Sequence, residues 1–195
     1  MANVNAIHSV GDSLVTYLTN VYPASLKAAH DCTFSLISSV EMNTAAEDGH
    51  NRLTLYLYRV TMNDQLRSSR RLNGMPGGGV PLSIDLHYLL TVWADHALDE
   101  QVILAWAMRQ LYLHPVMDQS SLSPEADWGP GDVVQLIPAE LSNEDVMRIW
   151  DALQPPYHLS VSYIARVVRI DPDVEPDTVP VVATDFVYTD RETQP

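Results

Sequence analysis

The chain has 195 residues, 46% of them hydrophobic, and a formal net charge of −14. Binding to nucleic acid needs clustered Lys and Arg, whereas this acidic sequence has 11 basic residues, of which only Lys27 is a lysine, so we expect no nucleic-acid partner. The length suffices for one hydrophobic core. The single cysteine, Cys32, fits a reducing compartment and a role as a small buried side chain.

The sequence lacks the signals of a membrane or secreted protein. No stretch approaches the roughly 18 apolar residues that a membrane-spanning helix requires, and the first 21 residues have neither a charged leader nor an unbroken apolar run. We therefore expect no membrane partner and a cytoplasmic place of synthesis.

The first predicted elements are a helix and a strand. A helix is expected from about Asn5 to Val21, ended by Pro23, and a strand from Cys32 to about Val40. The polar stretch Asn43–His50 is typical of a loop. Apolar residues recur in the helix at steps of three and four, which predicts one buried stripe of Ile7, Val10, Leu14, Tyr17 and Val21.

Two strands with strict alternation follow. Arg52–Val60 alternates leucines with Thr54, Tyr56 and Tyr58, and Pro81–Ala94 alternates over six consecutive pleats. The second run is long, so we expect an antiparallel partner of similar length. The predicted apolar face of this strand consists of Leu82, Ile84, Leu86, Tyr88, Leu90 and Val92. The opposite face carries Ser83, Asp85, His87 and Thr91.

Residues Asn63–Val80 join these strands and contain the arginines 67, 70 and 71, followed by Asn73-Gly-Met-Pro-Gly-Gly-Gly. The glycines resemble a phosphate-binding loop only superficially, because the GxxxxGK[ST] pattern and a following helix are missing. The segment is either a flexible connection or a loop that orders at a protein interface.

The second half of the chain predicts two more helices. One runs over Leu98–Leu113, with Asp95 or Asp99 as N-cap and Pro115 as its stop. Its predicted buried stripe is Ile103, Ala107, Met108 and Leu111. A long loop to Pro130, which includes Trp128-Gly-Pro-Gly, and a short strand Asp132–Ile137 come next.

The second helix has a well-specified start. Ser142 is the expected N-cap with Asp145 at the third helical position, and Leu141 and Val146 are placed as a hydrophobic staple. We expect this helix to bury Val146, Ile149, Trp150 and Leu153 and to end at Pro155-Pro156.

A final strand, Tyr157–Ile170, is long enough to pair with Pro81–Ala94. Together the elements predict an α/β (α+β) domain over residues 1–170, in which a mixed, largely antiparallel sheet with long strands is packed by about three helices.

Residues 171–195 differ in composition and are expected to form an acidic, proline-containing C-terminal arm. They hold seven acidic residues, one arginine and four prolines. Within them Val179–Thr189, which includes Phe186 and Tyr188, has strong strand propensity. This segment either adds to the sheet edge of a neighbouring molecule or folds back on its own domain.

The search for catalytic chemistry gives little. His8 with Asp12, and Asp85 with His87, could each supply two metal ligands, but a site needs three or four that converge. The sequence contains no HExxH, CxxC or Gly-x-Ser-x-Gly motif. We therefore expect no enzyme, metal or cofactor. The alternative is a metal- or ligand-dependent enzyme with a His/Asp site assembled in space around Asp85 and His87.

Several blocks together resemble a known family. They are Leu53-Thr-Leu-Tyr-Leu-Tyr-Arg-Val, Pro81-Leu-Ser-Ile-Asp-Leu-His-Tyr-Leu-Leu-Thr-Val-Trp-Ala-Asp, Leu111-Tyr-Leu-His-Pro-Val-Met, Val134-Gln-Leu-Ile-Pro-Ala-Glu-Leu-Ser-Asn-Glu-Asp, Ile149-Trp-Asp-Ala-Leu and Pro156-Tyr-His-Leu-Ser-Val-Ser-Tyr. Spread over about residues 5–170, they are similar to the DUF4255 family of cap, or tail-terminator, proteins of phage-tail-like contractile injection systems.

The resemblance implies a tail-terminator-like fold and a structural function. Members form a homohexameric ring that ends and joins the inner tube and the sheath, so tube protein, sheath protein and other copies of the chain are the implied partners. The ring would assemble in the cytoplasm, in a particle that is released or membrane-anchored. A head–tail completion protein is a related alternative. Candidate interface residues are Arg67, Arg70, Arg71, Met75, Trp128, Phe186 and Tyr188.

Overall fold

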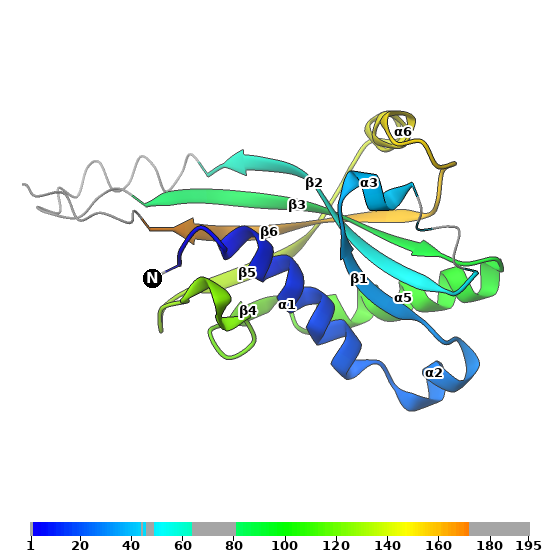
Figure 1. Ribbon diagram of the computed structural model, residues 1–195, viewed down its shortest axis with the longest axis horizontal. Helices are drawn as coiled ribbons and strands as arrows, with labels where there is room; N and C mark the ends of the chain where they lie inside the picture. The colour runs from blue at the N-terminus through cyan, green and yellow to red at the C-terminus, as the bar shows by residue number, and fades with distance from the viewer. Residues whose placement is uncertain (1, 44, 46–48, 64–80, 172–195) are drawn as a thin grey trace, which may run out of the picture.

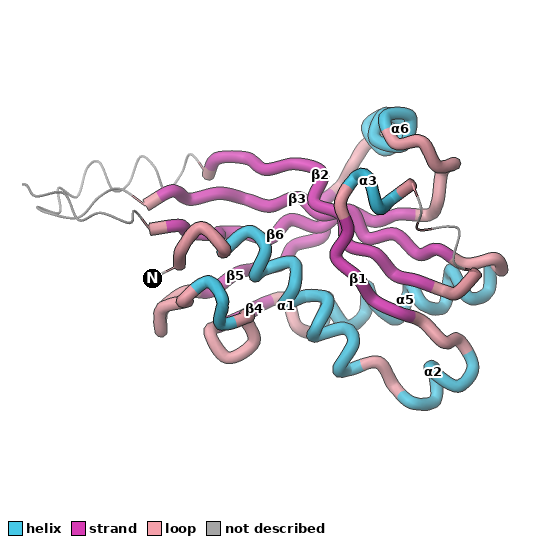
Figure 2. The backbone as a smooth tube through the Cα atoms, in the orientation of Figure 1, coloured by secondary structure: helices cyan, strands magenta, loops and turns pink. Residues whose placement is uncertain are grey.

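The computed structural model describes residues 2–43, 45, 49–63 and 81–171. They form a mixed six-stranded sheet with helices on both faces (Figures 1 and 2). The strand order is β1-β2-β3-β6-β5-β4, and every neighbouring pair is antiparallel except β1 and β2. This confirms the predicted mixed α/β class with a largely antiparallel sheet. The strands are β1 (Thr33–Ile37), β2 (Arg52–Met62), β3 (Leu82–Trp93), β4 (Val116–Asp118), β5 (Val133–Ala139) and β6 (Ser160–Ile170).

Three helices of ten or more residues lie within the described ranges, as the sequence predicts, and two short ones accompany them. The long ones are α1 (Ala6–Val21), α5 (Ala97–Leu113) and α6 (Asn143–Ala152); the short ones are α2 (Ala24–Ala29) and α3 (Ser39–Met42), and one 3-10 turn, η1, spans Pro124–Ala126.

Strand β3 is the centre of the sheet. It pairs with β2 on one side and with β6 on the other, so the expected partnership of the two long strands is confirmed. Its predicted apolar face is buried from Ile84 onward, while Leu82 is 43% exposed. The opposite face is also buried at Leu89 and Trp93, which the alternation did not predict. The sheet therefore supports a core on each side.

The two cores differ in size. The larger one lies between the sheet and helices α1 and α5, and unites Leu14, Leu90 and Ile103. The smaller one lies under α3 and α6, where the ring centroids of Trp93 and Trp150 are 5.9 Å apart. Figures 1 and 2 show α6 and α3 on one side of the sheet and α1 on the other.

Strand β1 is shorter than expected because a helix cap interrupts it. The predicted strand Cys32–Val40 ends at Ile37. Ser38 Oγ accepts a hydrogen bond from Glu41 N–H, and the Glu41 carboxylate accepts one from Ser38 N–H at 2.7 Å. This complete capping box starts α3 and turns the chain away from the sheet. The backbone N–H of Ser38 also lowers the pKa of Glu41.

The predicted helix faces need correction at two positions. Val21 is 37% exposed and Met108 is 39% exposed, whereas Leu18, Leu104 and Trp106 are buried in their place. Helix rotation is set by packing against the sheet, which periodicity alone does not define.

The start of α5 also differs from the prediction. His96 is its N-cap and makes no side-chain capping bond, so neither Asp95 nor Asp99 has the expected role. Asp99 instead contacts His30 Nδ1 at 2.5 Å.

The cap of α6 is confirmed, because Ser142 Oγ accepts a hydrogen bond from Asp145 N–H at 3.1 Å. Only Trp150 is fully buried on this helix; Leu141, Val146, Ile149 and Leu153 are partly buried against the smaller core.

The neighbouring strands differ from expectation at their ends. β6 starts at Ser160 rather than Tyr157, because Tyr157 and His158 pack on Trp150. β5 extends through Pro138 to Ala139; β4 pairs only with Val133–Gln135, so this end of β5 is an edge, where proline is tolerated.

The long loop predicted after α5 holds structure of its own. It contains β4 and η1, and it is tied to α1 by buried hydrogen bonds. Ser9 Oγ donates to Ser123 O at 2.9 Å and accepts from Trp128 Nε1 at 2.9 Å, and Ser13 Oγ accepts from Ser123 N–H at 2.7 Å. Trp128 is thereby held in the core with 5% of its surface exposed.

We predict that Ser9→Ala lowers the free energy of unfolding by about 1–3 kcal/mol, because it leaves the buried Trp128 Nε1–H and Ser123 carbonyl without their partner. Urea denaturation measures the change. Thr19→Ala is the matched control, since Thr19 makes only an exposed bond to Val15 O. Equal losses in both variants would contradict the importance of this contact.

Candidate protein interface

One edge of the sheet is half open. β1 pairs only with Arg52–Tyr56 of β2, and β2 continues for six more residues to Met62. No described strand pairs with Leu57–Met62 on the side opposite β3. Asn63 N–H donates to Ser83 O, so the backbone groups of Asn63 point towards β3. In an antiparallel pair the backbone groups of successive residues point to opposite sides of the strand. Those of Met62 and Val60 therefore point to the open side.

The register between β2 and β3 shifts between Leu57 and Arg59. The side chains after this shift therefore alternate between the two faces of the sheet out of phase with those before it. After it, Val60 lies opposite Leu86 and Met62 opposite Ile84. Both side chains therefore lie on the face of the larger core. They nevertheless remain 45% and 60% exposed, because the helices on that face leave this end of the sheet uncovered.

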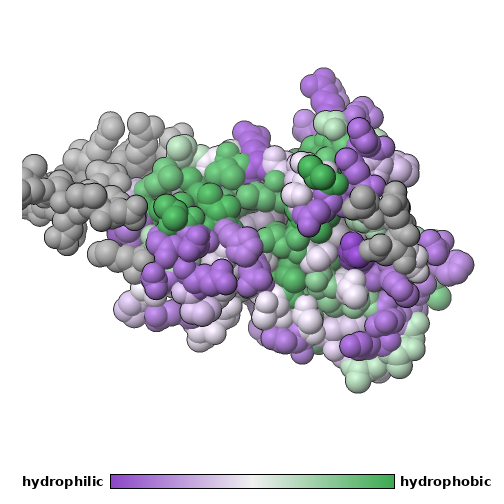
Figure 3. Space-filling model, viewed as in Figure 1, coloured by the Kyte–Doolittle hydropathy of each residue, from purple (hydrophilic) through white to green (hydrophobic). Residues whose placement is uncertain are grey.

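We call Val4, Val60, Met62 and Leu82 the sheet-end patch; all four are at least 43% exposed. Figure 3 shows apolar surface along this end of the sheet, above α1. A groove of about 670 Å³ adjoins the patch, between the start of α1, the end of β1 and β2. Val4, Ile7, Leu36, Leu57 and Tyr88 are among its lining residues. Exposed apolar surface next to an open strand edge is typical of a protein-binding site.

A second apolar surface lies where α5 ends and β4 begins. We call Met108, Tyr112, Leu113 and Val116 the α5 patch; their exposed fractions run from 39% to 76%. Met108 and Tyr112 are one helical turn apart, so they share a face of α5. The chain thus presents two different apolar surfaces.

The residues of the alternative catalytic hypothesis lie on the sheet face opposite α1, and each has partners there. Both carboxylate oxygens of Asp85 accept hydrogen bonds from Asn63 Nδ2, at 3.1 and 3.2 Å, and Arg166 Nε lies 3.3 Å away. His87 Nε2 is 2.9 Å from Thr61 Oγ1. Partial burial and the charge of Arg59 lower the pKa of His87. These contacts are those of a cross-strand polar network.

The structure places no three candidate metal ligands together within the described ranges. The paired residues His8 and Asp12 do not converge with others; His8 Nδ1 instead lies 3.8 Å from Glu125. Across the same residues, no helix is both long and apolar enough to cross a membrane.

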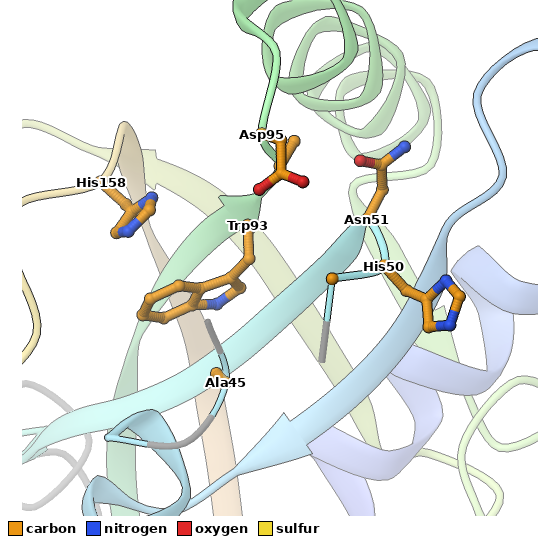
Figure 4. A pocket seen from close by; sticks show the side chains of 8 residues that line it. Ala45, His50, Asn51, Trp93, Asp95 and His158 are labelled. Carbon is orange, nitrogen blue, oxygen red and sulfur yellow. The ribbon is translucent and has the colours of Figure 1, made fainter. Parts of the chain in front are cut away.

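A small pocket of about 70 Å³ lies beside the smaller core (Figure 4). Trp93 forms its floor, Asp95 and Asn51 approach from one side, and His158 from the other. The His158 ring packs 4.4 Å from Trp93, and its partial burial lowers its pKa. The pocket is too small for a ligand of ordinary size.

The structure describes only one of the seven interface residues chosen from sequence. Arg67, Arg70, Arg71, Met75, Phe186 and Tyr188 lie outside the described residues. Trp128 is buried and contacts Ser9, so its ring stabilises the domain itself and is not a surface contact.

Sequence reasoning missed the sheet-end patch and the α5 patch, because it assumed that apolar strand and helix residues are buried. Strand length gave no signal, because the predicted strands Cys32–Val40 and Arg52–Val60 are equally long, whereas β2 exceeds β1 by six residues in the structure.

Comparison with known proteins gives a consistent result. The Pvc16 N-terminal domain family matches residues 9–184. The sheath/tube terminator of the extracellular contractile injection system PVC, solved in the extended state, shares the fold with a TM-score of 0.59 and 17% identity, over 96% of this chain and 65% of the terminator. The tube-terminating cap of the anti-feeding prophage gives a TM-score of 0.56 and 16% identity, over 96% of this chain and 62% of the cap. The chain thus spans less than two thirds of each structure. No curated protein matches the sequence.

Cys32 should react slowly with thiol reagents in the folded protein. Burial raises its pKa to about 12, with a smaller contribution from the charge of Asp31, so little reactive thiolate forms at pH 8. We predict that alkylation by iodoacetamide is at least about a hundredfold slower in buffer than in denaturing urea. Mass spectrometry follows the reaction, and similar rates in the two conditions would show that the thiol is accessible.

Acidification should destabilise the domain partly through His158. Folding lowers the pKa of His158, so as the pH falls the unfolded chain binds a proton before the folded chain does. The stability that His158 contributes is present above pH about 6.5, its ordinary pKa, and is lost as the pH falls towards its lower pKa in the folded state. We predict that His158→Phe reduces the loss of unfolding free energy between pH 7 and pH 5. Tyr157→Phe, which keeps the neighbouring ring and leaves His158 in place, should retain the wild-type slope in urea titrations. Parallel profiles for wild type and His158→Phe would contradict this role.

Proposed function

We propose that this chain, which belongs to the Pvc16 N-terminal domain family, is a structural cap, or tail-terminator, subunit of a contractile injection system. The observation that carries the proposal is the family match over residues 9–184, joined by a fold shared over 96% of the chain with two proteins that end such particles. By this reading the chain binds the end of the tube and the adjoining sheath.

The exposed surfaces support self-association into a closed ring. A ring is built from heterologous contacts, in which one surface of a subunit meets a different surface of the next. The sheet-end patch and the α5 patch are two such surfaces, formed by different elements of the fold. We propose that they, or surfaces continuous with them, join copies into a homohexamer.

Two segments outside the described residues contribute to the proposal through their sequence. Arginines 67, 70 and 71, with Met75, form a basic segment in a chain whose net charge is −14, and the acidic residues of 171–195 carry the opposite charge. Contact between them across a subunit boundary would be stabilised by charge-assisted hydrogen bonds. Phe186 and Tyr188 would supply apolar anchors.

The proposed role is mechanical and needs no catalytic group. Within the described residues Asp85 is bound by Asn63 and Arg166, and His87 contacts Thr61, so both act within the sheet. The Cys32 thiol is buried and protonated at neutral pH. These observations favour a structural protein over the alternative of a His/Asp enzyme.

Charge placed in the α5 patch should prevent capping. We predict that Tyr112→Glu, combined with Leu113→Glu, reduces ring formation and the fraction of capped tubes at least about tenfold, because the carboxylates would have to be desolvated in the contact. Size-exclusion chromatography with light scattering measures ring formation. Electron microscopy of the tubes and sheaths assembled with the protein measures capped ends and tube length.

Gln101→Glu provides the control for this experiment. Gln101 is exposed on the same helix but outside the α5 patch, so the variant should cap tubes as the wild type does. A wild-type protein that leaves tube ends bare and tube lengths unchanged would contradict the cap function itself. Binding to the neck of a phage head instead would indicate a head–tail completion protein.

A further inference from the structure

The open edge of β2 has the features of a strand acceptor. Along Leu57–Met62 the side opposite β3 has no described partner strand, and the N–H and C=O groups of Val60 and Met62 point there. Natural proteins cover or disrupt long edges, because an open edge pairs readily with another chain. Here the chain covers the first five residues of β2 with β1 and leaves the rest without a described partner, with a partly apolar groove beside Leu57.

The groove suits an added strand in its position and its chemistry. It lies where β1 would continue if Ser38 did not direct the chain into α3, and it is lined by Val4 and Ile7 of the N-terminal region and by Leu57 of β2. A strand placed there would gain backbone hydrogen bonds from β2 and would bury its apolar side chains in the groove. An occupant should therefore be extended, rich in strand-forming residues and apolar on one face.

Residues 179–189 of this chain fit that description. Eight of these eleven residues are β-branched or aromatic, and Val182, Thr184, Phe186 and Tyr188 would share one face of a strand. The segment lies outside the described residues, which end at Asp171. Asp171 N–H donates to Ala2 O at 2.9 Å, and the Asp171 carboxylate pairs with Arg169 at 2.9 Å. This exit is at the same end of the sheet as Met62, because Ile170 pairs with Leu82.

Distance decides between the chain's own β2 and that of a neighbour. β6 and β2 are separated by β3, so the open edge lies about 10 Å from the end of β6. The eight residues from 171 to 178 include prolines at 172 and 176, a composition that favours an extended chain of about 25 Å. A connector extended to that length is longer than the distance to its own β2 edge and can reach the edge of a neighbouring copy.

We propose that residues 179–189 of one copy add as a strand to the open β2 edge, Leu57–Met62, of a neighbouring copy. This inference rests on the self-association in the proposed function, and it names the acceptor edge and the donor segment. Each subunit would give one strand and receive one, which is a heterologous contact suited to a closed ring.

A cysteine scan tests the proposal on the full chain. One tagged copy of the chain carries Met62→Cys. It is mixed with a second, untagged copy that carries a single cysteine at one of the positions from 179 to 189, and each position is tested in turn. Cys32 is replaced by alanine in every copy. Because the cysteines are on different molecules, every disulfide is intermolecular. Strand addition predicts cross-link yields that alternate with a period of two along the scan. Gln101→Cys as acceptor, which is exposed on α5 but outside the α5 patch, should give no such pattern.

A backbone variant isolates the hydrogen bonds of the edge. Val60→Pro removes an N–H that points to the open side, and it should lower the yield from Met62→Cys about tenfold. Val60→Thr keeps this N–H and the branched shape, so it should cross-link like the parent. Equal yields from the two variants would overturn strand addition.

The remaining outcomes separate the possible failures. In a further variant both cysteines are placed in one chain. If this variant forms a disulfide within a monomer while the mixed copies do not cross-link, the segment folds back on its own domain, and the exchange between copies is overturned. No cross-link in either format, from a protein that still caps tubes, would overturn this inference alone. Loss of capping in the unmodified wild type would instead contradict the proposed function.

Discussion

Burial of β3 on both faces and along both edges is the constraint on which the rest of the structure depends. Tyr88 and Leu89, neighbours in sequence with opposite orientations, are 1% and 0% exposed. A strand buried in this way needs a layer on each side and a long partner at each edge. Helices α1 and α5 supply one layer, α3 and α6 the other, and β2 and β6 supply the partners.

The open edge is a consequence of the same arrangement. β2 must be long to cover β3, but β1 stops after five residues because Ser38 and Glu41 cap α3. Half of β2 therefore has a strand on one side only among the described elements. An uncovered edge normally invites aggregation, and the proposed strand addition would cover it. The proposed interface and the core thus have one structural cause.

Several polar groups inside the domain are used for its own packing. Ser9 and Ser13 join α1 to the segment that carries Trp128, and Thr54 accepts a hydrogen bond from the Trp93 indole at 2.8 Å. Each such bond removes a buried polar group from the set available for catalysis. Function in this molecule is therefore expected at its surfaces, as the proposed role of a terminator subunit requires.

The sequence by itself determined the elements whose signals are local. The alternation of Pro81–Ala94 and the Ser142 cap were predictable, because strand period and capping depend on residues close together in the chain, and the pairing of β6 with β3 was expected from their similar lengths. Only the tertiary structure decided which apolar residues are exposed. Trp128 was expected at the surface, yet its indole contacts Ser9, 119 positions away, while Val60, the last residue of the predicted strand Arg52–Val60, lies on the face of the larger core and is still 45% exposed. Burial depends on which distant segments cover a residue, and no local pattern contains that information.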